Sequence, residues 1–276
     1  MKDLLRSWDR FAQQWGGRNI ILFLDYDGTL APIAQSPQEA VLPKENKDLL
    51  RSLAKAPGCQ VVVISGRALA DVKAMVGIQE IDYIGNHGWE IEGPHIRFET
   101  LLAPQVTAAL EQIKYELEAK LSTIEGAFVE DKGTTLSVHY RLVAPQKVFL
   151  VKRIFNKASL PFRRQNKIKT GSGKKVLEIR PFLEWDKGKA ALWFLRRQEL
   201  ICGEGNVLPV YVGDDATDEE AFRALKAKGI AVLVGRGQKS HAQYYLESPE
   251  AVTEFLKCHL LQAVRPCATA GAKGAA

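Results

Sequence analysis

An aliphatic run that ends in two aspartates constrains this chain most. Residues 19–34 read NIILFLDYDGTLAPIA, so Asp25 and Asp27 follow directly after apolar residues. Similar runs end at Ser65 and Asp214, and helix-like patterns alternate with them, which is typical of an α/β fold with a parallel sheet. The runs are apolar at nearly every position, so we expect helices on both sheet faces. Ligands bind beyond the carboxyl ends of such strands, so these polar residues are predicted to face one crevice.

The pattern changes between residues 103 and 181. Apolar residues recur at helical spacing from Val106 to Leu121, and TTLSVHYR then alternates with period two. QKVFLVKRIFNKA predicts a second helix, and IKTGSGKKVLEIRP predicts two short strands around a Gly-Ser-Gly turn. We therefore expect a discontinuous core over residues 1–102 and 182–262, an inserted α/β domain over 103–181, and a disordered tail over 263–276.

Composition excludes several classes of protein. The 276 residues are 46% hydrophobic without a continuous run long enough to cross a bilayer, and the first fifteen residues predict a short amphipathic helix instead of a secretory signal. Four scattered cysteines have neither zinc-site spacing nor disulfide density, which favours the cytoplasm. The net charge of +6 indicates an anionic partner. On charge alone this partner could be nucleic acid, anionic lipid or a phosphorylated metabolite. The basic residues are spread along the chain without a recognisable binding module, so we expect no nucleic acid. The lack of a long apolar run leads us to expect no membrane.

The stretch DYDGT offers the groups needed for phosphoryl transfer. A carboxylate such as Asp25 at a strand end can ligate a hard cation or attack phosphorus. Asp27 is placed to donate and accept protons on the same substrate. Gly28 permits a tight turn, and the amides and hydroxyl around Thr29 can receive phosphate oxygens. The alternative is a plain Asp-Gly turn, which the four apolar residues before LDYDGTL disfavour.

Two further segments offer phosphate-binding groups. In VVVISGR, the Ser65 hydroxyl and nearby amides, including that of Gly66, can bind phosphate, although a plain turn explains this short motif equally well. In EWDKGKAALWFL, Asp186 is a plausible N-cap for a helix that begins at Lys187. A lysine there opposes the helix dipole, so a bound phosphate would explain it. A solvated surface lysine is the alternative.

The segment VYVGDDATDEEAF supplies a terminal group of acids. Asp214 directly follows a predicted strand and is best placed to complete an oxygen shell around magnesium. Asp215 and Asp218 are possible further ligands. Thr217 and Glu220 have the spacing of a capping box at the start of the next helix.

Together, and in this order, these segments resemble the haloacid dehalogenase (HAD) superfamily of phosphohydrolases. The motifs FLDYDGTLAPIA, ISGR, GNHGWEI, EDKGTTLSVHYR, VLEIRP, WDKGKA and GDDATDEEAF are similar to those of trehalose-6-phosphate phosphatases and extend the resemblance from Phe23 to Phe222. The resemblance implies a Rossmannoid parallel-sheet core of HAD type with an inserted α/β cap of the C2 type. It also implies a sugar phosphate, trehalose 6-phosphate, as substrate.

The resemblance implies magnesium-dependent hydrolysis through an aspartyl-phosphate. Asp25 would be the nucleophile and Asp27 the general acid and base. Magnesium would be held by Asp25, the Asp27 carbonyl and Asp214. Lys187 would assist catalysis, and the implied phosphate-binding residues are Gly28, Thr29, Ser65, Gly66 and Lys187.

The resemblance also places sugar recognition in the cap. Glu130, Lys132 and Glu178 match the family positions that contact the sugar ring farther from phosphate. In an extended strand, alternation puts Glu130 and Lys132 on the same face, and likewise His139 and Arg141. On a later strand, Val176, Glu178 and Arg180 share one face, and Leu177 and Ile179 point toward the cap core. The remaining candidates are Arg67, Asn86, His87 and Lys174. Charges that merely solvate the outer sheet face are the alternative.

The sequence leaves two other functions open and argues against a third. A related sugar phosphatase acting on sucrose phosphate or a mannosyl phosphate would use the same core chemistry. A catalytically silent sugar-phosphate sensor would share the fold, although the intact DYDGT disfavours it. A phosphorylated receiver domain is much shorter and has no inserted domain. A trehalose-phosphate synthase is a possible protein partner.

Overall fold

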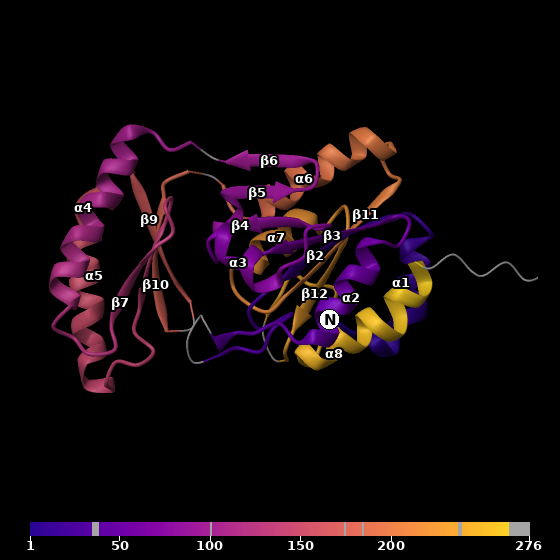
Figure 1. The fold of residues 1–276 in the computed structure, drawn as a ribbon, viewed down its shortest axis with the longest axis horizontal. Helices are drawn as coiled ribbons and strands as arrows, with labels where there is room; N and C mark the ends of the chain where they lie inside the picture. The colour runs from indigo at the N-terminus through magenta and orange to yellow at the C-terminus, as the bar shows by residue number, and fades with distance from the viewer. Residues whose placement is uncertain (35–38, 100, 174, 184, 237–238, 265–276) are drawn as a thin grey trace, which may run out of the picture. The chain divides into compact units, whose positions relative to one another are not determined.

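The chain forms two compact units (Figure 1). The computed structural model describes residues 1–276 apart from 35–38, 100, 174, 184, 237–238 and 265–276, so most of the predicted tail lies outside the described residues. The first unit comprises Met1–Ser65, Leu69–Arg97 and the chain from Asp186 onward. The second comprises Gly66–Ala68 and Phe98–Trp185. The chain therefore leaves the first unit and returns to it.

A nine-stranded sheet is the centre of the first unit, in the order β1-β13-β12-β11-β2-β3-β4-β5-β6. Neighbouring strands are parallel from β1 to β4, and β5 pairs antiparallel with β4. The strands are β1 (Lys2–Asp3), β2 (Asn19–Asp25), β3 (Cys59–Ile64), β4 (Asp82–Gly85), β5 (Glu90–Gly93), β6 (Ile96–Glu99), β11 (Val207–Gly213), β12 (Ile230–Val234) and β13 (Tyr244–Leu246). The predicted parallel sheet is confirmed; the antiparallel edge was not predicted.

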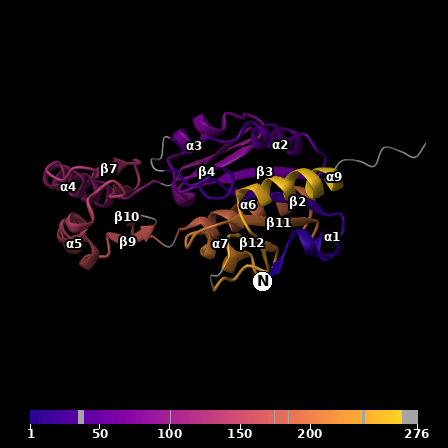
Figure 2. The same ribbon diagram turned by 90° about the horizontal axis from the view of Figure 1, so that it is seen from below.

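Helices cover both faces of this sheet (Figure 2). They are α1 (Trp8–Trp15), α2 (Lys44–Ala54), α3 (Leu69–Val76), α6 (Lys187–Cys202), α7 (Asp218–Leu225), α8 (Pro249–Glu254) and α9 (Leu261–Val264), with 3₁₀ turns at Leu5–Ser7 and Asn86–Gly88 and a π-helical turn at Phe255–Leu260. Leu22 and Leu24 of β2 belong to the core cluster that contains the α2 leucines. Phe23 points the other way and packs edge-on against Phe194 of α6, with ring centroids 5.8 Å apart. Asp25 shares this face with Phe23 because strand side chains alternate.

The second unit is a four-stranded antiparallel sheet with helices on one face (Figure 1). Its strands run in the order β7 (Phe128–Asp131), β8 (Leu136–His139), β10 (Val176–Pro181) and β9 (Ile168–Gly173). Helices α4 (Pro104–Leu121) and α5 (Val148–Arg164), with a 3₁₀ turn at Pro145–Lys147 before α5, share one hydrophobic cluster with Leu177 and Ile179. Both helices and the inward direction of these two residues are therefore as predicted.

The register of β9 and β10 corrects one prediction. Gly171, Ser172 and Gly173 lie within β9 and pair with Glu178, Leu177 and Val176, so Gly-Ser-Gly is not the turn. Lys175, directly before β10, has a φ of +67°, which suits a tight hairpin. A glycine-rich sequence resembles a turn, but cross-strand pairing places it in the strand.

None of the helices in the described part of the chain combines the length and apolar character needed to cross a membrane.

Candidate active site

The sheet order brings three polar strand ends together. β2 lies between β11 and β3, so the carboxyl ends that carry Asp25, Asp214 and Ser65 are side by side. Asp25 ends β2, Ser65 follows β3, and Asp214 follows β11. All three residues are buried. This is the edge at which ligands bind in parallel sheets.

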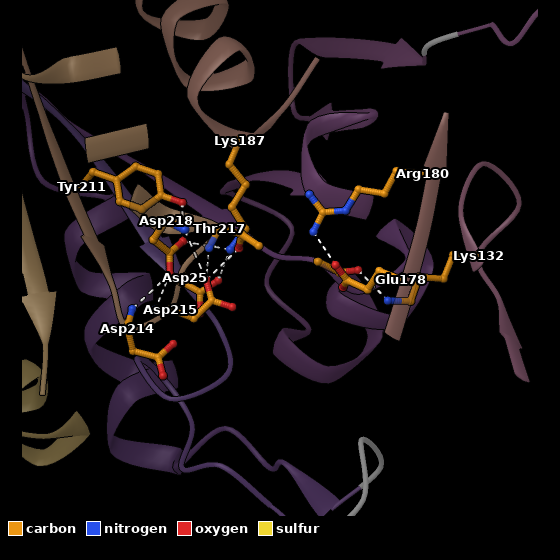
Figure 3. A network of polar contacts seen from close by, with 11 residues as sticks. Asp25, Lys132, Glu178, Arg180, Lys187, Tyr211, Asp214, Asp215, Thr217 and Asp218 are labelled. Atoms are coloured by element: carbon orange, nitrogen blue, oxygen red, sulfur yellow. Dashed lines mark hydrogen bonds and ion pairs between the residues drawn. The ribbon is translucent and has the colours of Figure 1, made fainter. Parts of the chain in front are cut away.

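Lys187 is a buried cation that joins two of the acids (Figure 3). Its Nζ lies 2.7 Å from Asp25 Oδ1 and 2.8 Å from Asp218 Oδ1. The predicted N-cap is confirmed, because Asp186 Oδ1 accepts a hydrogen bond from Lys189 N at 2.8 Å. Gly188 allows α6 to approach α7, since a Cβ there would lie 2.5 Å from the Glu220 carbonyl oxygen. Because the Lys187 side chain is buried, the alternative of a solvated surface lysine is wrong.

Burial and charge together set the ionisation of this pair. Burial, and then the charge of Asp218, raise the pKa of Asp25 well above its usual value, although Lys187 opposes them. Burial would lower the pKa of Lys187, but Asp218 and Asp25 outweigh it and raise that pKa well above its usual value. Lys187 therefore remains protonated and positively charged. Asp25 lies beside it, and burial disfavours the ionised form of this acid.

Asp218 is fully buried, and its carboxylate accepts hydrogen bonds from four donors among the described residues (Figure 3). Lys187 Nζ and Tyr211 Oη donate to its Oδ1, both at 2.8 Å. The amides of Asp214 and Asp215 donate to its Oδ2 at 3.0 and 3.1 Å. Burial raises its pKa to about 6 despite the charge of Lys187. Tyr211 was not predicted as a site residue from the sequence. The available indication was its position on an apolar strand, two residues before Gly213.

Asp215 caps the turn before α7. Its Oδ1 accepts hydrogen bonds from Thr217 N at 2.8 Å, Thr217 Oγ1 at 2.7 Å and Asp218 N at 3.2 Å. Burial opposes ionisation, but Lys187 and the Thr217 donors outweigh it and lower the pKa of Asp215 to about 2. The predicted capping box of Thr217 and Glu220 is wrong, because the Thr217 side chain makes no cap bond at the helix start. The Thr217 hydroxyl donates to the carboxylate of Asp215 instead.

The loop after β2 is tightly turned against Asp214. Gly28 has a φ of +87°, and a Cβ there would lie 2.3 Å from Asp214 Oδ2, so only glycine fits. The Gly28 amide donates to the Ala31 carbonyl at 2.7 Å, so this predicted phosphate donor is used within the loop. The half-buried Asp27 pairs with Ala31 in an isolated parallel β-bridge. Thr29 is fully buried, and its Oγ1 has no hydrogen-bond partner among the described residues. An orphaned hydroxyl suits a ligand oxygen.

Ser65 and the loop from Asn86 to Gly88 lie against each other. The Ser65 carbonyl accepts a hydrogen bond from His87 N at 3.0 Å. Asn86 and His87 are buried and have left-handed φ values of 49° and 57°. His87 is close enough for its charge to help lower the pKa of Asp215. Backbone strain of this kind is typical of functional loops.

The second unit carries a separate polar group on one face of its sheet. Glu130, Ser137 and Glu178 lie in one row across β7, β8 and β10. Glu130 Oε2 lies 2.7 Å from His139 Nε2 and 3.7 Å from Lys132 Nζ. Burial raises the pKa of Glu130, but the hydrogen bond from His139 and the charge of Lys132 lower it overall. Glu130 therefore contacts two other predicted residues, His139 and Lys132.

Other predicted residues of the second unit lie around this row. Lys132 Nζ donates to the Gly66 carbonyl at 2.8 Å, and the charge of Arg67 contributes to the lowered pKa of Glu130. Arg141 is exposed beyond the end of β8, and Lys174 lies outside the described residues. Sequence reasoning did not select Arg180, which is buried and donates from Nη2 to Glu178 Oε2 at 2.5 Å (Figure 3). Its position two residues after Glu178 was the available indication.

Comparisons with known proteins agree with one another. A family model described as trehalose-phosphatase matches residues 23–250. Trehalose 6-phosphate phosphatase RA3 of Zea mays is 37% identical, with 87% of this chain and 70% of that protein covered. The solved C-terminal domain of a C. albicans trehalose-6-phosphate phosphatase has a TM-score of 0.78 at 22% identity, covering 95% of this chain and 98% of that one. A haloacid dehalogenase-like hydrolase from B. subtilis has a TM-score of 0.55 at 17% identity, covering 86% and 98%.

Proposed function

The chain belongs to the trehalose-phosphatase family and is a phosphatase with the HAD fold, and from this premise we propose that it hydrolyses trehalose 6-phosphate through an aspartyl-phosphate on Asp25. The observation that carries the proposal is the buried Lys187 ammonium, 2.7 Å from the strand-end carboxylate Asp25. A cation so placed can offset the charge of an incoming phosphate while the neighbouring carboxylate attacks it.

In the first half-reaction, an Asp25 oxygen attacks phosphorus in line and the bond from phosphorus to the sugar oxygen breaks. Asp27, protonated at this stage, donates its proton to the departing sugar oxygen, which releases trehalose. In the second half-reaction, Asp27 accepts a proton from water, the water oxygen attacks phosphorus, and the acyl-phosphate bond breaks. Phosphate leaves, and the Asp25 carboxylate and the Asp27 acid are restored.

Phosphate oxygens need donors, and the first unit offers several. Lys187 supplies the charged donor. The buried Thr29 hydroxyl, which lacks a partner among the described residues, supplies a neutral one. We assign Ser65 to the same role, since it directly follows the strand next to β2. Gly66, which belongs to the second unit, remains a predicted phosphate donor. The Gly28 amide is already bonded to Ala31, so Gly28 serves through its backbone conformation.

The acids of this edge suit magnesium. Carboxylate oxygens of Asp25, Asp214 and Asp218 lie within 4.8 Å of one another, and hard oxygen donors are the ligands that magnesium prefers. We propose Asp25, Asp214 and the Asp27 carbonyl as its ligands. Asp218 and Asp215 are weaker candidates, because their carboxylates already accept several hydrogen bonds. Bound magnesium would neutralise phosphate charge.

We assign sugar recognition to the second unit, as a cap over residues 103–181 inserted in a catalytic core over 1–102 and 182–262. The polar row across the sheet contains Glu130 and Glu178. His139 and Lys132 contact Glu130, and Arg141 is close to His139 in the sequence. Fixed charged donors and acceptors are what selective binding of sugar hydroxyls requires. Asn86, His87, Arg67 and Lys174 remain predicted substrate contacts. A cytoplasmic location and a synthase partner also remain predictions.

The test is phosphate release across a panel of trehalose 6-phosphate, sucrose phosphate, a mannosyl phosphate and p-nitrophenyl phosphate, with and without magnesium. We expect the highest kcat/KM with trehalose 6-phosphate and none of this activity in EDTA. Preference for another sugar phosphate would reassign the substrate. Binding of trehalose 6-phosphate without phosphate release would instead identify a sensor.

A further inference from the structure

One face of β11 is shaped to receive the Asp218 carboxylate. Tyr211 and Gly213 are two residues apart on this strand and point to the same side. A Cβ at Gly213 would lie 2.3 Å from Asp218 Cγ, so the carboxylate occupies the space of the missing side chain. Tyr211 places its hydroxyl 2.8 Å from Asp218 Oδ1. The strand thus supplies both the room and a donor.

The two oxygens of Asp218 have different partners (Figure 3). Oδ2 accepts two backbone amides from the turn in which Asp218 itself lies. Among the described residues, the donors to Oδ1 are both side chains, Lys187 Nζ and Tyr211 Oη. Oδ2 therefore fixes the carboxylate to its own turn, and Oδ1 is the point at which Asp218 acts on Lys187.

Tyr211 is itself held firmly. Its ring stacks on Phe23 at 6.0 Å and meets Phe222 edge-on at 5.7 Å. Burial raises the pKa of its phenol well above the usual value, so the hydroxyl remains a donor. Ring packing fixes the position of the hydroxyl, and the raised pKa keeps its proton available for donation.

We propose that Tyr211 is a positioning residue that acts through Asp218 to set the location of the Lys187 ammonium. Lys187 is shared between Asp218 and Asp25, at 2.8 and 2.7 Å. With the Tyr211 donor present, Asp218 Oδ1 is partly satisfied and leaves Lys187 available to Asp25 and to phosphate. Without that donor, Oδ1 has Lys187 as its remaining side-chain donor and draws the ammonium away from Asp25. This inference rests on the proposed function, in which Lys187 binds phosphate during the attack by Asp25.

The test is Tyr211→Phe, which removes one oxygen and keeps the packed ring. We expect kcat to fall about ten- to hundredfold on both trehalose 6-phosphate and p-nitrophenyl phosphate, with KM within about threefold of the wild-type value. Tyr83→Phe is the matched control. Tyr83 is also buried, and its hydroxyl donates to the Ile78 carbonyl at 2.6 Å and accepts from the Ile78 amide at 3.2 Å, so this variant loses buried hydrogen bonds outside the acidic site. Its kcat should stay within about twofold of wild type.

A double-mutant cycle separates positioning from a structural role. If Tyr211 acts through Asp218, Tyr211→Phe should change kcat by less than about twofold in the Asp218→Asn background. A kcat near wild type in Tyr211→Phe, or the full loss repeated in the Asp218→Asn background, overturns the proposal. If Asp218→Asn does not fold, the kcat and KM of Tyr211→Phe against Tyr83→Phe decide alone. Wild-type protein without phosphatase activity would overturn the proposed function instead.

Discussion

Lys187 Nζ lies 2.7 Å from Asp25 Oδ1, although 162 residues separate the two in the chain. Asp25 is the last residue of β2 and lies on the same face of the strand as Phe23, which packs against α6. Lys187 is the first residue of α6. Strand alternation therefore points the acid at the start of this helix. The ammonium also reaches Asp218, so one buried cation neutralises part of the charge on two buried acids.

Replacing Lys187 with methionine should destabilise the protein by about 3–5 kcal/mol, because it leaves buried acids without their cation. Phosphatase activity should also be lost. Urea unfolding in EDTA at neutral pH measures the first effect. Adding Asp218→Asn should recover part of the lost free energy of unfolding, since it removes one of the stranded charges. Lys189→Met, two residues further along the same helix, is the control and should cost less than about 1 kcal/mol.

Replacing Asp25 with asparagine should separate activity from stability. The amide has nearly the same volume but cannot form an acyl-phosphate, so kcat should fall by roughly a thousandfold or more. Because burial and Asp218 raise the pKa of Asp25, its charge is costly, and the variant should be more stable by about 0.5–2 kcal/mol without metal at neutral pH. Retained turnover would reject the covalent step, and a lower unfolding midpoint would reject the electrostatic account.

The sequence predicts the parts of this site that depend on neighbouring residues. The apolar runs before Asp25 and Asp214 predict parallel strands whose polar ends face one crevice. The adjacency of β2 and β11 is seen only in the order of the sheet. The burial of Lys187 depends on contacts across 162 residues, so the sequence alone left a surface lysine open. Tyr211 and Arg180 were missed because an aromatic residue in an apolar strand and a cation on a sheet face are ordinary without their partners. The Gly-Ser-Gly error shows that composition does not determine register.

Replacing Asp214 with asparagine should weaken magnesium binding about ten- to hundredfold, because the strand-end acids supply the charge that offsets the cation. Titration calorimetry with magnesium chloride measures this without substrate. Asp131→Asn is the control, since Asp131 is exposed and pairs with Lys114 on the second unit. Equal magnesium affinity in the Asp214 and Asp131 variants would exclude Asp214 as a ligand.

Alanine at Glu130, Lys132 or Glu178 should lower kcat/KM on trehalose 6-phosphate by roughly ten- to a thousandfold, through lost charged hydrogen bonds worth about 1.5–3 kcal/mol or somewhat more. Hydrolysis of p-nitrophenyl phosphate, which has no sugar, should change much less. Asp131→Ala, next to Glu130 on β7, is the matched control and should leave both activities near wild type. Equal losses on both substrates in folded variants would contradict the assignment of sugar recognition to this row.

Asp215 should make stability depend on pH in a defined window. Its pKa is about 2 in the folded protein against an ordinary value of 3.8, so the folded state favours the charged carboxylate. The stabilisation is complete well above pH 3.8 and is lost as the pH falls from there toward 2. Since Asp215 is partly exposed, we expect Asp215→Asn to cost about 1–2 kcal/mol at neutral pH, less than the full shift would give.

The measurement is urea unfolding of wild type and Asp215→Asn in EDTA, at steps from neutral pH down to about pH 3. The difference between the two proteins should be constant down to about pH 5 and then shrink, because protonation removes the charge that Lys187 and Thr217 favour. Asp48→Asn, at an exposed site on α2, should stay within about 0.5 kcal/mol of wild type throughout. A difference for Asp215→Asn that does not vary with pH would assign its effect to the lost turn hydrogen bonds, and not to its charge beside Lys187.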